Sequence, residues 1–255
     1  MTWKLIGKSV IGTSHVQSGK DCEDSNHFEI LNNGQENEIA IGFVSDGAGS
    51  AKFAKQAAIR AVQEAVSISI QYIEDEVEIE EKHLVALVER IYDIFRIESA
   101  AINVPLNEFS CTLLGFITLP HKSCFLQIGD GAIVRNDGSG HFTYIWWPQN
   151  GEYQNTTSFI VDDANVRNLQ VKIIHEKIDE IGMFTDGLQM LALDYDSECA
   201  HQPFFNDLFK WLRRAESAEH VSILNRKLDE YLSSTSINNR TDDDKTLLLA
   251  TKYIL

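Results

Sequence analysis

Three apolar segments of this 255-residue chain each end in an aspartate that is followed by a glycine. The three pairs are Asp46-Gly47, Asp130-Gly131 and Asp186-Gly187. A strand that ends in this way places a carboxylate at the rim of a sheet, and the glycine lets the backbone approach whatever the carboxylate holds. We therefore expect the three carboxylates to contribute to one site.

Asp-Gly is also an ordinary turn dipeptide. Asp137-Gly138 illustrates that use, because it lies between two short predicted strands and is followed by Ser139-Gly140. Asp46 and Asp186 differ from it, since each ends a predicted buried strand and leads into a predicted helix. Unrelated turns and helix caps are the alternative to a shared acidic site.

Carboxylates that converge raise one another's pKa unless cations neutralise them. Oxygen ligands without paired cysteine or histidine suit Mg²⁺ or Mn²⁺ better than Zn²⁺. Two such ions side by side can activate water and hold a phosphoryl group. The pattern therefore predicts a two-metal hydrolytic site, whereas the nucleophile elbow, the P-loop and the dinucleotide fingerprint have no match in the sequence.

Composition narrows the class of protein further. The formal net charge of −16 argues against nucleic-acid binding, which depends on clustered lysine and arginine. No segment has the length of a membrane span or the form of a signal peptide. The four cysteines are far apart, which predicts free thiols in a reducing cytoplasm rather than disulfides or a zinc site. We expect a monomer, because no surface pattern favours a dimer.

The elements that would position these carboxylates alternate between helical and strand-like stretches. Helical spacing predicts a helix over 54–72, capped by Ser50, and a second helix with Leu84, Val88, Ile91 and Phe95 on one face. Strands with short turns follow over 109–147, which indicates an antiparallel sheet.

Further strands are expected at 169–175 and 178–185, and helices at 204–214 and 218–232. A polar linker, 233–241, leads to a last strand that begins at Lys245. We expect a single α+β domain over residues 1–255. Its strands could form two sheets with the helices outside them, and residues 148–165 are predicted to form a mobile flap beside the site.

The order of motifs resembles the metal-dependent protein phosphatase family, protein phosphatase type 2C, and most of all its compact bacterial subgroup. The motifs are Cys22-Glu23-Asp24-Ser25, Val44-Ser45-Asp46-Gly47-Ala48-Gly49, Ser110-Cys111-Thr112-Leu113, Ile128-Gly129-Asp130-Gly131, Phe184-Thr185-Asp186-Gly187 and Asp243-Asp244-Lys245-Thr246. Each motif alone is weak, but the six occur in family order over nearly the whole chain. The resemblance implies a four-layer α-β-β-α sandwich, in which two antiparallel sheets are flanked by helical pairs and the metals lie at one end.

The resemblance also implies roles at the matched positions. Asp46 would bridge two ions, Mn²⁺ or Mg²⁺, and the carbonyl of Gly47 would contact one of them. Asp186 and Asp243 would complete the shell of the first ion.

Glu23 and Asp24 would hold the waters bound to the second ion, and Asp130 with Asp186 would bind a more labile third ion. In the family, water that bridges the metals attacks phosphorus directly, without a phosphoenzyme. The implied substrates are proteins phosphorylated on serine or threonine, and some members of the subgroup act opposite a partner Ser/Thr kinase.

Several positions depart from the family pattern: Gly19, Ala48, Ser50, Gly131 and Asp244. Gly19 stands where an arginine commonly grips the substrate phosphate. Lys20 could supply a positive charge there but not a bidentate fork. Ala48 replaces a histidine that some members offer as a general acid, and Asp244 replaces an asparagine, which adds a negative charge beside a metal ligand.

No departure removes a direct metal ligand, so the sequence favours a metal-dependent protein-serine/threonine phosphatase with Asp46, Asp24 and Lys20 as catalytic residues. One alternative is a catalytically silent relative that binds a partner or a phosphoprotein, which the glycine at position 19 suggests. Another is a metal phosphoesterase that acts on a small molecule.

Overall fold

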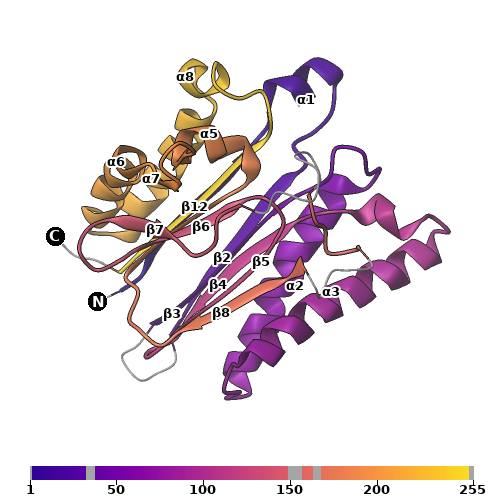
Figure 1. Cartoon of the computed structure of the whole chain (residues 1–255), viewed down its shortest axis with the longest axis horizontal. Helices are drawn as coiled ribbons and strands as arrows, with labels where there is room; N and C mark the ends of the chain where they lie inside the picture. Colours follow the sequence, from indigo (N-terminus) through magenta and orange to yellow (C-terminus); the bar gives the residue numbers. More distant parts are fainter. Residues whose placement is uncertain (1, 33–37, 149–156, 163–167, 253–255) are drawn as a thin grey trace.

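Two antiparallel sheets of five strands lie at the centre of the computed structural model, with helices on the outer side of each (Figure 1). The structure describes residues 2–32, 38–148, 157–162 and 168–252. This architecture is the α-β-β-α sandwich that the sequence predicts.

The β3 sheet carries two of the Asp-Gly motifs. Its strand order is β2 (Asp24–Asn32), β3 (Glu38–Asp46), β4 (Leu113–Thr118), β5 (Ser123–Ile128) and β8 (Gln170–Ile174). Two long helices, α2 (Ala54–Glu74) and α3 (Glu81–Ala101), cover its outer face (Figure 1). A short 3-10 helix, η1 (Leu106–Phe109), joins α3 to β4.

The β12 sheet carries the third motif. Its strand order is β1 (Lys4–Val10), β12 (Lys245–Thr251), β9 (Glu180–Phe184), β6 (Ala132–Asn136) and β7 (Phe142–Tyr144). Helices α6 (Gln202–Arg213) and α7 (Ala218–Leu232) cover its outer face. The smaller elements are α1 (Thr13–Ser18), η2 (Asp186–Leu188), α5 (Gln189–Ala192), α8 (Thr235–Asn238), and the paired strands β10 (Leu193–Asp194) and β11 (Cys199–Ala200).

The apolar strands follow from burial on both faces of each sheet. In β12, Leu247 and Leu249 pack against the α6 and α7 layer, whereas Leu248 and Ala250 face the layer between the sheets. Successive strand residues point to opposite faces, so a strand covered on both sides is apolar throughout. Each fully buried leucine contributes about 1.5–3 kcal/mol to stability, so these strand ends are held firmly.

Several predicted boundaries are wrong. Ser50 does not cap α2, which begins at Ala54 after Phe53. The backbone reverses first, where the Ala51 N–H donates to the Ala48 carbonyl. The strand expected from Phe109 begins only at Leu113, because Phe109 ends η1.

Two short helices were missed. Helix α1 lies in a polar stretch for which no helix was predicted, and α8 lies in the expected linker 233–241. Helix α1 buries none of its six residues, so it lacks the apolar periodicity that identifies a helix in sequence.

The predicted flap, 148–165, lies largely outside the described residues. In its described part, Ile160 is fully buried and its N–H donates to the carbonyl of Cys111 at 3.0 Å. This part of the segment is therefore attached to the core beside β4. None of the described helices combines the length and apolarity needed to cross a membrane.

Candidate metal centre

The carboxylates of Asp46, Asp130 and Asp186 converge at one end of the sandwich. One carboxylate oxygen from each of the three lies within 4.8 Å of the corresponding oxygens of the other two. Asp46 ends β3, Asp130 follows β5 in the same sheet, and Asp186 follows β9 in the opposite sheet. The two sheets thus contribute to one acidic cluster, as the three Asp-Gly motifs predict.

The glycine after each aspartate permits a close approach of backbone segments. A Cβ atom on Gly47 would lie 2.5 Å from the carbonyl oxygen of Ala54 and 2.9 Å from that of Glu23. A Cβ on Gly187 would lie 2.0 Å from the carbonyl oxygen of Asp244. Any side chain at these two positions would separate the segments, so the glycines keep the carboxylate-bearing turns together.

The cluster is electrostatically unfavourable without cations. Burial, together with the charges of its acidic neighbours, raises the pKa of Asp46 and of Asp186 well above the usual range. Burial also raises the pKa of Asp130, although a hydrogen bond from Thr157 opposes the shift. The Oδ1 atom of Asp130 is buried and has no hydrogen-bond partner among the described residues. Converging, under-satisfied carboxylate oxygens are the donor set that Mg²⁺ and Mn²⁺ prefer.

Asp24 extends the cluster across the β3 sheet. Its Oδ2 accepts hydrogen bonds from Thr185 at 2.7 Å and from Thr246 at 2.8 Å, while its buried Oδ1 has no partner among the described residues. Burial raises the pKa of Asp24 to about 7, although the two threonine hydroxyls lower it. The threonines belong to the opposite sheet and fix one oxygen, which leaves the other available to the site.

Asp243 and Asp244 are adjacent in sequence but have different surroundings. Asp243 lies next to the turn that carries Asp186, since a Cβ on Gly187 would be 3.5 Å from the Cβ of Asp243, and its charge contributes to the raised pKa of Asp46, Asp130 and Asp186. Burial raises the pKa of Asp243 itself.

Asp244 instead organises the N-terminal segment. Its carboxylate accepts hydrogen bonds from the N–H of Gly12 at 2.6 Å and of Glu23 at 2.5 Å, and it pairs with His15 Nδ1 at 2.9 Å. The expected extra negative charge is therefore present, but three donors surround it.

The Asp243 turn is also held by a buried lysine. The ammonium of Lys245 donates to the carbonyl of Asp243 at 3.2 Å, to Asn238 Oδ1 at 3.1 Å and to the carbonyl of Ile11 at 3.3 Å. Burial lowers the pKa of this lysine. It joins α8, β1 and the turn before β12 at the edge of the site.

Glu23 and Lys20 lie together near the cluster rather than within the triad. The Lys20 ammonium is 2.8 Å from the carbonyl oxygen of Gly49 and 3.3 Å from Glu23 Oε1. Both contacts hold Lys20 close to the loop that follows Asp46. No described contact places the carbonyl of Gly47 in the cluster, so its role as a ligand stays a prediction.

Gly19 has a structural role that an arginine would fill only at an energetic cost. It ends α1 in the left-handed region, with φ 71° and ψ 22°. Its N–H donates to the carbonyl of Val16 at 3.3 Å. Residues with a Cβ adopt this conformation at a cost, so glycine at this position is explained by the way α1 ends.

Sequence reasoning missed the residues that orient the carboxylates. Thr185 and Thr246 donate hydrogen bonds to the carboxylate of Asp24. Thr157 donates to the carboxylate of Asp130, and Gln189 donates to its backbone carbonyl. In the sequence, only the positions of Thr185, directly before Asp186, and of Thr246, three residues after Asp243, hint at these contacts.

Comparison with known proteins identifies the family. A family model described as protein phosphatase 2C matches residues 11–233. The chain belongs to the protein phosphatase 2C family. Among curated proteins, it is 35% identical over 251 residues to Serine/threonine-protein phosphatase 3 of Escherichia coli (strain K12), and the match covers 98% of each chain. The predicted family is thus confirmed.

Solved structures of the protein phosphatase 2C type share the fold. Serine/threonine phosphatase Stp1 from Staphylococcus aureus has a TM-score of 0.60 at 16% identity, over 98% of this chain and 95% of that one. RsbX, solved in complex with magnesium, has a TM-score of 0.56 at 15% identity, over 98% of this chain and 94% of that one. These likenesses confirm the predicted fold class.

Proposed function

We propose that this chain is a metal-dependent phosphatase that hydrolyses phosphoserine and phosphothreonine in proteins. The observation that carries the proposal is the convergence of Asp46, Asp130 and Asp186, each of which offers one carboxylate oxygen within 4.8 Å of those of the other two. Family membership and the 35% identical relative, a serine/threonine-protein phosphatase, support the reaction class.

Asp46, Asp186 and Asp243 are the proposed ligands of the first Mn²⁺ or Mg²⁺ ion. Asp46 would also contact a second ion, and Asp130 with Asp186 would hold a third. When bound, such ions lower the pKa of coordinated water and neutralise phosphoryl oxygens. The raised pKa values of the carboxylates are consistent with a site that a cation completes, because a cation favours their ionised form.

Asp24 is the proposed residue that orients water at the site. Thr185 and Thr246 hold its Oδ2, so its other oxygen, which has no described partner, can accept a hydrogen bond from water. A bound cation would favour the ionised form of this carboxylate and keep it as an acceptor for water. We assign Asp24 to positioning the water that attacks phosphorus directly.

Lys20 is the proposed phosphate contact. Its ammonium is held at the edge of the cluster by Gly49 and Glu23, and Lys20 directly follows Gly19 in the chain. As a compact point charge, Lys20 contacts one phosphate oxygen, whereas an arginine would hold two. We therefore expect weaker phosphate binding than an arginine would give, without loss of hydrolysis.

The test compares one peptide carrying phosphoserine, phosphothreonine or phosphotyrosine at the same position. With Mn²⁺, release of phosphate is expected from the first two peptides and not from the third. Asp46→Asn is expected to lack activity, whereas Asp137→Asn, which changes the exposed Asp-Gly turn, is expected to retain it.

Folded protein that binds the phosphopeptides without releasing phosphate would overturn the proposal in favour of a silent binding module. Hydrolysis confined to small phosphate esters would overturn the assignment of protein substrates.

A further inference from the structure

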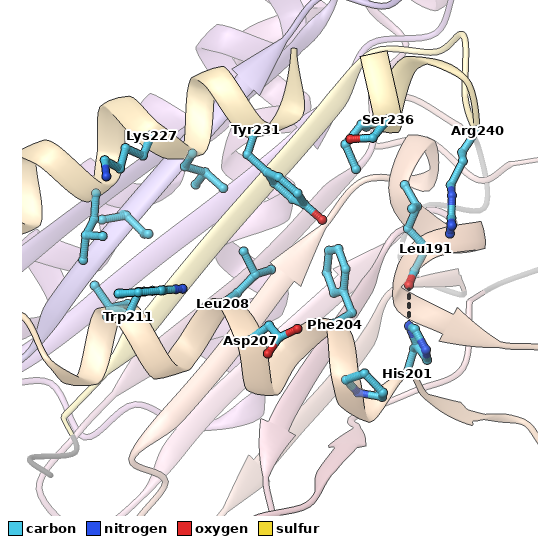
Figure 2. Close-up of a pocket in the computed structure, with 16 residues that line it drawn as sticks. Leu191, His201, Phe204, Asp207, Leu208, Trp211, Lys227, Tyr231, Ser236 and Arg240 are labelled. Atoms are coloured by element: carbon cyan, nitrogen blue, oxygen red, sulfur yellow. Dashed lines mark hydrogen bonds between the residues drawn. The ribbon is translucent and has the colours of Figure 1, made fainter. Parts of the chain in front are cut away.

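A groove of about 650 Å³ lies between α6 and α7, and α8 borders one end of it (Figure 2). Its volume is within the range of roughly 300–1,000 Å³ that small-molecule sites occupy. None of its lining residues belongs to the carboxylate cluster or to the residues that hold it. The groove is therefore separate from the proposed reaction.

The body of the groove is apolar. Phe204, Leu208 and Leu212 line it from α6, and Leu228 lines it from α7. Leu212 is fully buried at the base. Trp211 lies along one side with 57% of its surface exposed, so the groove has an aromatic wall open to solvent. Covering an exposed apolar surface of this kind with an apolar ligand is energetically favourable.

Two cations line the groove without ionic partners. The side chains of Arg240 and Lys227 make no hydrogen bond or ion pair with any other residue that the structure describes, and both border the apolar surface (Figure 2). Tyr231 points from α7 into the groove, and the charge of Arg240 acts on its hydroxyl. The Arg240 end of the groove thus carries exposed charged donors beside the apolar body, and Lys227 lies towards the opposite end, near Trp211 (Figure 2).

The charge balance in the groove is opposite to that of the whole chain. Arg240 and Lys227 face a single carboxylate, Asp207, in a chain whose formal net charge is −16. Arg240 can hold a carboxylate through two parallel hydrogen bonds. A ligand with a negative head group at this end and an apolar body along α6 matches both features.

We infer that the groove between α6 and α7 binds a single-chain amphiphile with an anionic head group, which Arg240 holds while the chain lies against Leu208 and Trp211. Asp207 faces the groove from α6 and disfavours a second anionic group on the ligand. The expected ligand class is therefore a monoanionic, unbranched carboxylate rather than a dianionic phosphate.

Calorimetric titration with dodecanoate, below its critical micelle concentration, tests the inference directly. Protein treated with a chelator is used, so binding is independent of the metal centre and of catalysis. Saturable binding of one molecule per chain is expected. Dodecanol and dodecylamine, which share the chain but not the negative charge, are expected to bind about tenfold more weakly, because neither can pair with the guanidinium of Arg240.

Three variants locate the ligand. Arg240→Gln is expected to weaken dodecanoate about tenfold and to leave dodecanol unchanged, whereas Arg90→Gln on α3, outside the groove, changes neither. Leu208→Trp fills the groove and is expected to abolish binding of both. Trp211→Ala, at an exposed position that the fold tolerates, is expected to weaken both.

Absence of saturable binding to folded wild-type protein would overturn the inference. So would equal affinity for dodecanoate in Arg240→Gln and wild type, tighter binding of dodecylamine than of dodecanoate, or undiminished binding to Trp211→Ala and Leu208→Trp.

Discussion

Asp24 lies directly opposite Asp46 in the antiparallel ladder between β2 and β3. The charge of Asp24 is one cause of the raised pKa of Asp46, after burial. Strand pairing therefore places two carboxylates side by side, and like charges in this position are destabilising unless a cation or a proton intervenes. The free energy of unfolding of the metal-free protein therefore depends on the protonation of this pair.

Metal-free protein is expected to lose stability as the pH rises towards neutrality. The pKa of Asp24 is raised from 3.8 to about 7, so at intermediate pH the folded state holds a proton that the unfolded state has released. Stability falls with pH wherever the folded state binds more protons. The stabilising contribution of Asp24 is fully present below 3.8 and is lost as the pH rises through about 7.

Urea unfolding of chelator-treated protein at about pH 5 and about pH 7.5 measures this effect. The free energy of unfolding is expected to be lower at the higher pH by at least about 1 kcal/mol. Mn²⁺ is expected to raise it at neutral pH, because metal binds the ionised carboxylates. Equal stability at both pH values without metal would contradict the electrostatic account.

Replacing Asp46 by asparagine is expected to stabilise the metal-free protein at neutral pH. The change removes one of the mutually repelling charges and keeps the size of the side chain. The expected gain is about 1 kcal/mol, or about 2–4 °C in Tm, and Mn²⁺ is expected to add much less stability than in wild type. Asp137→Asn serves as the control and should leave both quantities unchanged.

Replacing Asp244 by alanine is expected to destabilise the fold. The change leaves the N–H groups of Gly12 and Glu23 without their acceptor, at a cost of about 2–4 kcal/mol. Asp244→Asn keeps one carboxamide oxygen and should cost less. Asp242→Ala, at the exposed neighbour, is the control in thermal unfolding. A similar loss in the Asp242 and Asp244 variants would reject the role assigned to Asp244.

Gly19→Ala is expected to destabilise the protein by about 1 kcal/mol. The cost comes from the backbone alone, since a Cβ at Gly19 would meet no atom within 4 Å but φ is +71°. Gly49→Ala is the matched control, because a Cβ at Gly49 has room and its φ is not positive. Chemical unfolding of the two variants measures the difference, and equal stabilities would show that the end of α1 is unstrained.

A buried ion pair on the β12 sheet is expected to be costly to break. Arg213 donates to Glu180 at 2.7 Å through Nε and at 2.6 Å through Nη2, and Glu180 is buried. Arg213→Met leaves the carboxylate without its cation, at a cost of about 3–5 kcal/mol. Arg135→Met, which removes a pair with the exposed Glu176, should cost at most about 1 kcal/mol. Unfolding free energies that fail to separate the two would contradict this assignment.

The sequence predicted the parts of the fold that depend on apolar patterning. Helices α2 and α7 and the strands that end in Asp46 and Asp186 were found because burial produces a regular pattern of side chains. The acidic cluster followed from the same strands, since their ends meet at one edge. Helix α1 could not be found in this way, because none of its residues is buried.

The orientation of the carboxylates was not predictable from the sequence. Thr185 and Thr246 come close to Asp24 only because β9, β12 and β2 are brought together by the two sheets. Asp244 has the same residue type as Asp243 but is buried, whereas Asp243 is exposed, and it accepts from three donors of the N-terminal segment. Such contacts depend on tertiary structure, which single-chain patterns do not record.

Hydrolysis of p-nitrophenyl phosphate as a function of Mn²⁺ concentration tests the proposed metal centre most directly. Wild type, Asp186→Asn and Asp137→Asn are compared, with circular dichroism to show that each is folded. Saturable Mn²⁺-dependent activity is expected in wild type and Asp137→Asn, and a loss of at least about a hundredfold in Asp186→Asn. Activity that is independent of Mn²⁺ and Mg²⁺, or that survives in Asp186→Asn, would contradict it.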